Sequence, residues 1–235
     1  MAKKRADLIR FERLDRLPEY IKISCLDIAD HFKVKRNYLP QFCRLINSSK
    51  VWNMDNLDTM LNGWVKNSQK IYPPKFIDMV YKAFSQCNNI EDIGDLRGAL
   101  VEALVIASYG GPKVLQNPNY GWGALVKLKE EDKFDEVRYR CPQHRVGDCL
   151  HRNTVDFGYW NGYHGEFYEC KVNPESIGCK EKNYMLELQE KLKNKGITYD
   201  LIFVCANHTE SVQIELDRLN LDIKFKAVGY DNLFN

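Results

Sequence analysis

The chain has 235 residues, of which 44% are hydrophobic and 28% charged. This composition is typical of a folded globular protein, long enough for one large domain or two small ones. No apolar run approaches the roughly 20 residues of a membrane-spanning helix, and the basic N-terminus lacks the apolar stretch of a secretory signal. We therefore expect a cytoplasmic protein with no membrane partner, in which the eight cysteines are reduced.

The net charge of +2 is unevenly distributed along the chain. Residues 1–50 hold 12 Lys and Arg against 6 Asp and Glu, a net of +6, whereas the remaining residues hold 22 against 26, a net of −4. Residues 1–50 thus form a basic N-terminal segment, which we call the basic front, attached to a mildly acidic remainder. This asymmetry suggests that the basic front contacts a polyanion. A solvated basic surface would show the same asymmetry.

The N-terminal part of the chain shows helical patterns up to the tandem prolines Pro73 and Pro74, which no continuous helix can contain. One face of an amphipathic helix is indicated by the spacing of Leu57, Met60, Leu61 and Trp64. Phe76, Val80 and Phe84 continue the same period after the prolines. We expect a helical region over 1–72 and a connecting helix or linker over 73–95.

Residues 26–46 resemble a helix-turn-helix motif. The first helix would carry Ile28 and Ala29, the turn Val34, and the second helix Tyr38, Leu39 and Phe42. The N-terminal end of the second helix, the part that enters a DNA groove, would present Lys33, Lys35, Arg36 and Asn37. Pro40 counts against this interpretation unless it lies in the first turn of its helix. A helical packing module is the alternative.

Residues 96–235 alternate between helical and strand patterns. Asp95 is placed to cap a buried helix over 96–105, which Gly110-Gly111-Pro112 would end. A strand over 124–128, a hairpin over 153–172, and a helix through Met185, Leu188 and Leu192 follow. The pattern then indicates a strand over 199–205, a helix near 209–219 and a last strand over 223–228. This order predicts an α/β fold with a mixed sheet.

The hairpin carries the most specific signal. Asn161-Gly162 between two strand-like runs indicates a two-residue type I′ turn, which would pair 160 with 163, 158 with 165 and 156 with 167. Asp156, Glu169 and Lys171 then share one face. The backbones of Asp156 and Glu169 would lie roughly 7–8 Å apart along a diagonal, near enough for both carboxylates to reach a single cation. Two carboxylates and an ammonium suit metal-assisted hydrolysis of a phosphodiester. A salt bridge between Glu169 and Lys171 on an exposed sheet face is the other interpretation.

Asp156 followed by Glu169-Cys170-Lys171 resembles the D…ExK signature of PD-(D/E)XK nucleases, with Val155 where the motif has its proline. The resemblance implies a restriction-endonuclease-like core. Such a core has a helix, three antiparallel strands, a helix and another strand, and residues 96–205 match this order. It also implies that Mg²⁺ or Mn²⁺ is held by Asp156, Glu169 and the backbone carbonyl of Cys170.

Two further residues follow from the same resemblance: Glu102 as the glutamate of the first core helix and Gln189 as a polar active-site residue on the later helix. The implied activity is a metal-dependent DNA endonuclease, plausibly a homodimer, acting in restriction or phage defence. A helix-turn-helix DNA-binding protein with a catalytically silent core and an RNA-directed nuclease are the alternatives.

Four potential zinc ligands lie within a short segment: Cys141, His144, Cys149 and His151. Zinc prefers such nitrogen and sulfur sets, and a structural zinc ion here would anchor the start of the hairpin. The spacing matches no familiar zinc finger, so unliganded loop residues are the alternative.

Overall fold

A computed structural model describes residues 7–14, 16–142, 151–219 and 225–235. In chain order the elements are β1 (Ile9–Arg13), α1 (Glu19–Phe32), α2 (Leu39–Ser48), α3 (Leu57–Ser68), α4 (Pro74–Ser85), α5 (Ile90–Ser108), β2 (Tyr120–Glu130), β3 (Lys133–Glu136), β4 (Tyr139–Arg140), β5 (His151–Arg152), β6 (Val155–Trp160), β7 (His164–Lys171), α6 (Cys179–Asn194), β8 (Thr198–Cys205), α7 (Thr209–Arg218) and β9 (Lys226–Val228). The order of elements expected after residue 96 is confirmed, and β3, β4 and β5 are additions to it.

The main sheet is mixed and follows the order β1-β2-β6-β7-β8-β9, with β3 also paired to β2. Strands β1, β2, β3, β6 and β7 pair antiparallel, whereas β7, β8 and β9 run parallel. Helix α6 connects β7 to β8 and α7 connects β8 to β9, as parallel pairs require a crossover. The expected α/β class with a mixed sheet is therefore confirmed. Strands β4 and β5 form a separate two-stranded sheet.

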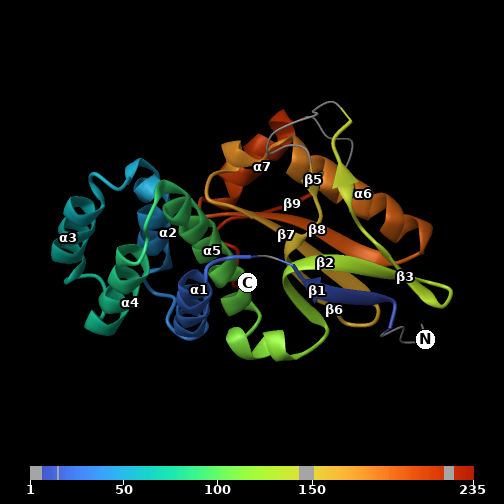
Figure 1. The fold of residues 1–235 in the computed structure, drawn as a ribbon, viewed down its shortest axis with the longest axis horizontal. Helices are drawn as coiled ribbons and strands as arrows, with labels where there is room; N and C mark the ends of the chain where they lie inside the picture. Colours follow the sequence, from blue (N-terminus) through green and yellow to red (C-terminus); the bar gives the residue numbers. More distant parts are fainter. Residues whose placement is uncertain (1–6, 15, 143–150, 220–224) are drawn as a thin grey trace.

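The helices divide into two groups on the two sides of the sheet (Figure 1). One continuous core joins α1 to α5 with the sheet side chains Trp122, Phe157, Tyr168 and Cys170. A second core joins α6 and α7 with the opposite side of the sheet, through residues such as Phe167, Tyr184 and Phe203. Helix α5 is buried around most of its circumference because it lies between the other N-terminal helices and the sheet.

Helix α5 begins earlier than the sequence pattern indicated. Its N-cap is Asn89, whose side-chain oxygen accepts a hydrogen bond from the Asp92 N–H at 2.8 Å, so the expectation that Asp95 caps the helix was wrong. Asparagine is a strong N-cap, and the acidic Glu91 and Asp92 in the first turn interact favourably with the helix dipole. These local preferences outweigh the more visible apolar run further along.

The N-terminal region is not wholly helical, because Ile9–Arg13 forms β1 and pairs with β2 at Phe11↔Val126. The side chain of Phe11 lies over Gly121 and Gly158, which face each other on β2 and β6. A Cβ atom at Gly121 would lie 2.6 Å from the Cβ of Phe11. The two glycines therefore make room for an aromatic ring that belongs to a distant part of the sequence.

Pro40 lies in the first turn of α2, where the missing N–H costs nothing, so the proline is compatible with the helix. Leu39 and Phe42 lie on α2 as predicted, whereas Tyr38 is its N-cap; all three are buried. The free cysteines found among the described residues are Cys25, Cys43, Cys87, Cys141, Cys170, Cys179 and Cys205. Within the same ranges no helix is both long and apolar enough to cross a membrane.

Replacing Gly158 with alanine should destabilise the protein, because the new methyl group collides with the ring of Phe11. We expect a cost of about 1–3 kcal/mol, the scale of overpacking a core. Urea unfolding of Gly158→Ala, Phe11→Ala and the double variant measures it. Gly158→Ala should reduce the free energy of unfolding by less in the Phe11→Ala background than in the native protein. Equal reductions in both backgrounds would mean that the Phe11 ring does not require this glycine.

Candidate functional site

The turn between β6 and β7 differs from the expected type I′ turn. Trp160 pairs with Gly165 and Gly158 with Phe167, so the expected pairs 160/163 and 158/165 were wrong by two residues. The side chain of Asn161 accepts hydrogen bonds from the N–H groups of Tyr163 and His164, at 2.9 and 2.8 Å, which lengthens the turn. Because the shift is two residues, each side chain keeps its expected face.

The corrected register places the two predicted acids closer together than expected. Phe157 pairs with Tyr168, and one further step along both strands brings Asp156 opposite Glu169 instead of Phe167. Asp156 Oδ2 accepts a hydrogen bond from the backbone N–H of Cys170 at 2.6 Å. On its other side Asp156 lies where the β2–β6 pairing is interrupted, next to Gly123, whose φ of +53° favours glycine.

A third side chain, Arg152 from β5, joins the two carboxylates. Its Nη2 donates to Asp156 Oδ1 at 2.6 Å and to Glu169 Oε2 at 2.8 Å. The two oxygens are therefore no further apart than the sum of these distances. Arg152 was not among the residues identified from the sequence, since only the tertiary structure brings the β4–β5 ribbon to the main sheet.

Lys171 extends from the same side of the sheet and links Glu169 to helix α6. Its Nζ lies 3.0 Å from Glu169 Oε1 and 2.9 Å from Glu181 Oε1. The other oxygen of Glu181 accepts a hydrogen bond from the Gly178 N–H at the start of α6, at 3.1 Å. Glu181 therefore fixes Lys171 to a helix terminus. Its position three residues after Gly178 is a helix-start signal, but its role beside Lys171 has no sequence signature.

Burial controls the electrostatics of this group, which we call the Asp156 site: Arg152, Asp156, Glu169, Lys171 and Glu181. Glu169 has no exposed surface, so the interpretation as a salt bridge on an exposed sheet face was wrong. Burial raises the pKa of Glu169 to about 7, against the lowering effect of the Arg152 charge. Burial alone would lower the pKa of Arg152 and of Lys171, but the surrounding carboxylates overcome this and raise both.

Three buried polar atoms of this region make no hydrogen bond: Arg152 Nε, Glu169 Oε1 and the hydroxyl of Tyr184. The Lys171 ammonium is close enough to Glu169 Oε1 for an ion pair, but not in the orientation of a hydrogen bond. Burial raises the pKa of the Tyr184 hydroxyl, on which the charges of Arg152, Glu169 and Asp156 also act. Unpaired buried polar atoms are costly and rare, so their concentration here is unusual.

Glu102 lies near the same group but on the α5 side. Its carboxylate accepts a hydrogen bond from Trp122 Nε1 at 2.5 Å. The thiol of Cys170 has a raised pKa, first from burial and then from the charges of Asp156, Glu102 and Glu169. The charges of the three predicted acids therefore all act on Cys170, with Glu102 on the α5 side of the sheet.

Gln189 is buried on α6. The contact of α6 with Lys171 comes from Glu181, and Gln189 follows it by just over two turns, roughly 12 Å along the helix axis. The place of Gln189 in an active site stays a prediction from the resemblance.

The other predicted sites are only partly described. Of the four candidate zinc ligands, His144 and Cys149 lie outside the described residues, Cys141 is buried and His151 is exposed. The candidate nucleic-acid contacts occupy the turn after α1, where Lys35, Arg36 and Asn37 are exposed. Arg36 stacks on the ring of Phe234, with its guanidinium carbon 4.2 Å from the ring centre.

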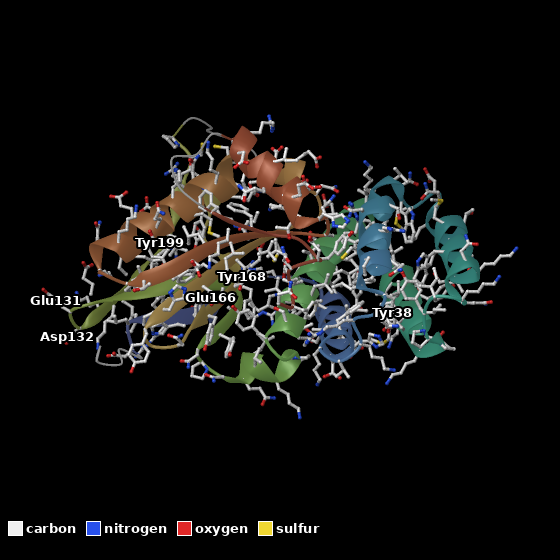
Figure 2. The ribbon with its side chains drawn as sticks, turned by 180° about the vertical axis from the view of Figure 1, so that it is seen from behind. Tyr38, Glu131, Asp132, Glu166, Tyr168 and Tyr199 are labelled. Atoms are coloured by element: carbon white, nitrogen blue, oxygen red, sulfur yellow. The ribbon has the colours of Figure 1, made fainter. Side chains whose placement is uncertain are left out.

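A second group of potential ligands was not foreseen from the sequence. His164, Glu166 and Asp200 each offer one ligand atom, and these atoms lie within 4.8 Å of one another. Figure 2 shows Glu166 and Tyr168 side by side near the middle of the molecule. Glu166 and Asp200 line a cavity of about 340 Å³, together with Tyr109, Tyr168, Lys226 and the C-terminal residues.

The carboxylates of this second group already have protein partners. Asp200 Oδ2 is 3.0 Å from His164 Nε2 and 2.5 Å from Lys226 Nζ. Glu166 accepts hydrogen bonds from the hydroxyls of Tyr109 and Tyr168. The adjacent strands β7 and β8 run parallel, which is why residues far apart in the sequence meet here.

The raised pKa of Glu169 makes the free energy of unfolding of the metal-free protein, measured in EDTA, depend on pH. A carboxyl group whose pKa is higher in the folded protein holds more protons there, so its contribution falls as pH rises. The stability of the native protein relative to Glu169→Gln should therefore decrease between about pH 4.5 and 7. Urea unfolding of both proteins across this range measures the difference, and a flat or rising difference would mean that the pKa is not raised.

Comparison with known proteins does not place the chain in a family. No family model and no curated protein matches it. The crystal structure of protein VC1899 from Vibrio cholerae is similar with a TM-score of 0.42 and 12% identity, over 96% of this chain and 56% of that one. The chain thus spans little more than half the length of that protein. A likeness at this level carries no argument, and the restriction-endonuclease-like core stays an expectation from the sequence.

Proposed function

We propose that this protein is a Mg²⁺- or Mn²⁺-dependent nuclease that hydrolyses phosphodiester bonds in DNA, with Asp156 and Glu169 as the metal ligands. One observation carries the proposal: an oxygen of each carboxylate contacts the same cationic nitrogen, Arg152 Nη2. The negative charge of two side chains therefore converges on one point, an arrangement that suits a single cation.

The residues present fit a divalent cation in two respects. The carboxylates of Asp156, Glu169 and Glu181 outnumber the two cationic side chains that contact them. The Cys170 N–H also holds the Asp156 carboxylate by its Oδ2, so that Oδ1, the oxygen that contacts Arg152, points to the shared position. Mg²⁺ commonly binds one or two carboxylates and completes its coordination with water and substrate phosphate, so two protein ligands suffice.

The side chains of the site would then divide the work. When bound, a divalent cation supplies acidification of water and neutralises charge on the phosphate. Lys171, held between Glu169 and Glu181, orients the attacking water and stabilises the charge that develops in the transition state. Glu181 acts as a positioning residue through Lys171, and the Cys170 N–H fixes the Asp156 carboxylate.

The second group, His164, Glu166 and Asp200, is the competing place for a metal. Its carboxylates are already engaged by Lys226, Tyr109 and other partners, so metal binding there would have to break these contacts. The carboxylates of the Asp156 site are also engaged, by Arg152, Lys171 and the Cys170 N–H, but two buried polar atoms of these residues, Arg152 Nε and Glu169 Oε1, make no hydrogen bond. This contrast favours the Asp156 site.

DNA as the substrate rests on the basic front of the chain. Lys33, Lys35, Lys75 and Lys113 all act electrostatically on the end of α1, at Asp30 or His31, so lysines from separate segments gather there. Such clusters attract a phosphate backbone. An RNA-directed nuclease and a helix-turn-helix DNA binder with a silent core remain the alternatives, and a setting in restriction or phage defence follows from the resemblance alone.

Replacing Asp156 with asparagine should reduce Mg²⁺-dependent cleavage of plasmid DNA by at least about 10²-fold, since it removes a ligand charge but keeps an acceptor for the Cys170 N–H. Mg²⁺ or Mn²⁺ should raise the melting temperature of the native protein, because a ligand of the folded state stabilises it by mass action. This rise should disappear in Asp156→Asn. Gel assays with plasmid, linear DNA and RNA, with Mg²⁺ or EDTA, and thermal melts measure both effects.

Asp200→Asn is the matched control, because it changes the same functional group in the second cluster. It should retain the metal-induced rise in melting temperature and cleavage. If Asp200→Asn instead loses the metal response while Asp156→Asn keeps it, the metal site has been assigned to the wrong cluster. Cleavage by native protein in EDTA would contradict the proposed mechanism.

Lys35 tests the contribution of the basic front, because it is exposed in the turn between α1 and α2. Lys35→Glu should weaken DNA binding and reduce the slope of log affinity against log salt by about one unit, the effect of one lost phosphate contact. Lys66→Glu, at an exposed position on α3, is the charge-matched control. If both variants and the native protein show the same salt dependence of affinity, Lys35 makes no phosphate contact, and the helical region is a packing module. Fluorescence anisotropy with a labelled duplex provides the measurement.

A further inference from the structure

Arg152 reaches the two carboxylates from outside the main sheet. It belongs to β5, whose partner among the described strands is β4 in the separate two-stranded sheet, whereas Asp156 and Glu169 belong to β6 and β7. Withdrawal of the guanidinium therefore breaks no backbone pairing between the strands that carry the carboxylates.

The contact made by Arg152 leaves its buried Nε–H donor unused. One nitrogen, Nη2, donates to both carboxylates, and the buried Nε makes no hydrogen bond. A guanidinium has five N–H donors and binds oxyanions best through two parallel hydrogen bonds. In this arrangement Arg152 acts as a point charge between two carboxylates, and a donor suited to a second oxyanion is left unpaired.

The same two oxygens are the ones that a shared metal ion would need. Asp156 Oδ2 is occupied by the Cys170 N–H and Glu169 Oε1 faces Lys171, which leaves the oxygens that contact Arg152. Arginine does not lose its proton at physiological pH. A cation bound by both carboxylates and the Arg152 guanidinium therefore exclude each other, and the arginine must move.

We propose that Arg152 is a mobile catalytic residue, which holds Asp156 and Glu169 together in the metal-free protein and turns to the scissile phosphate when a divalent cation replaces it. The inference rests on the proposed nuclease function and adds a residue to it. The planar guanidinium matches two phosphate oxygens, and it would stabilise the charge that develops on them during hydrolysis.

This exchange has a measurable consequence for metal affinity. If the carboxylates are free in only a fraction of metal-free molecules, the apparent affinity for metal is reduced by that fraction. Arg152→Met should therefore bind Mn²⁺ about 10-fold more tightly or better, by isothermal titration calorimetry. The same variant should cleave DNA at least about 10²-fold more slowly at saturating metal, because the phosphate contact is lost. A residue with only a structural role would not improve metal binding.

Two matched variants separate this effect from simpler ones. Arg140→Met removes an exposed arginine from the neighbouring strand β4 and should leave metal affinity and cleavage unchanged. Lys171→Met removes the other positively charged side chain of the site. It therefore measures how much the loss of one positive charge, by itself, strengthens metal binding. Arg152→Met should exceed Lys171→Met by about 10-fold, since only Arg152 contacts the competing oxygens.

The native protein provides a test that does not depend on a stable Arg152→Met variant. The side-chain Nε–H signal of Arg152 in ¹⁵N NMR, assigned by its absence in Arg152→Lys, should shift when Ca²⁺ is added. An unchanged signal in a protein that binds Ca²⁺ would overturn the proposed movement.

The outcomes also separate this inference from the proposed function. If the native protein binds metal through Asp156 and cleaves DNA, but Arg152→Met binds metal no more tightly than Lys171→Met, only the role of Arg152 fails. If the native protein neither binds Mg²⁺ or Mn²⁺ at Asp156 nor cleaves, the nuclease proposal fails and the inference with it.

Discussion

The burial of the Glu169 carboxylate is the constraint on which the rest of the site depends. A charged group without exposed surface is very costly unless cations and hydrogen bonds compensate it. Two cations from different elements, Arg152 on β5 and Lys171 on β7, compensate part of this cost, and the pKa of Glu169 stays raised by burial. Glu181 in turn neutralises Lys171, so three separate parts of the fold are held to one carboxylate. A fold selected for stability alone would achieve the same cohesion with apolar residues, which is why this group suggests chemistry.

The arrangement of the sheet explains how the charges can be buried there. The two sides of β7 face different cores: Tyr168 and Cys170 contribute to the core with α5, and Phe167 to the core with α6 and α7. The charged residues lie where β7 ends, beside the interruption of the β2–β6 pairing and the first turn of α6. Backbone groups that are not used in regular pairing are available at such places. The Cys170 and Gly178 N–H groups both donate to carboxylates of the site.

The two metal-ligand candidates of this protein differ in how completely their side chains are paired. At His164, Glu166 and Asp200 the carboxylates receive hydrogen bonds from tyrosines, a histidine and a lysine, and Glu166 and Asp200 line a cavity near the C-terminus. At the Asp156 site the buried polar atoms exceed the available partners. Proximity of potential ligands alone therefore does not identify a metal site. The state of their hydrogen bonds is the more informative property, since unpaired buried groups are costly and need a reason.

The sequence by itself determined the α/β class, most of the helices and strands, and the shared side of Asp156, Glu169 and Lys171. These features depend on local periodicity and on the alternation of side chains along a strand, which a register shift of two residues does not alter. It did not determine the start of α5, the edge strand β1 or the turn at Asn161, because the partners that decide them are distant or compete locally. Only the tertiary structure placed Arg152 between the carboxylates and Glu181 beside Lys171. Buried charged residues pair with residues that are close in space. When these partners come from separate elements, no periodic pattern in the sequence indicates the pairing.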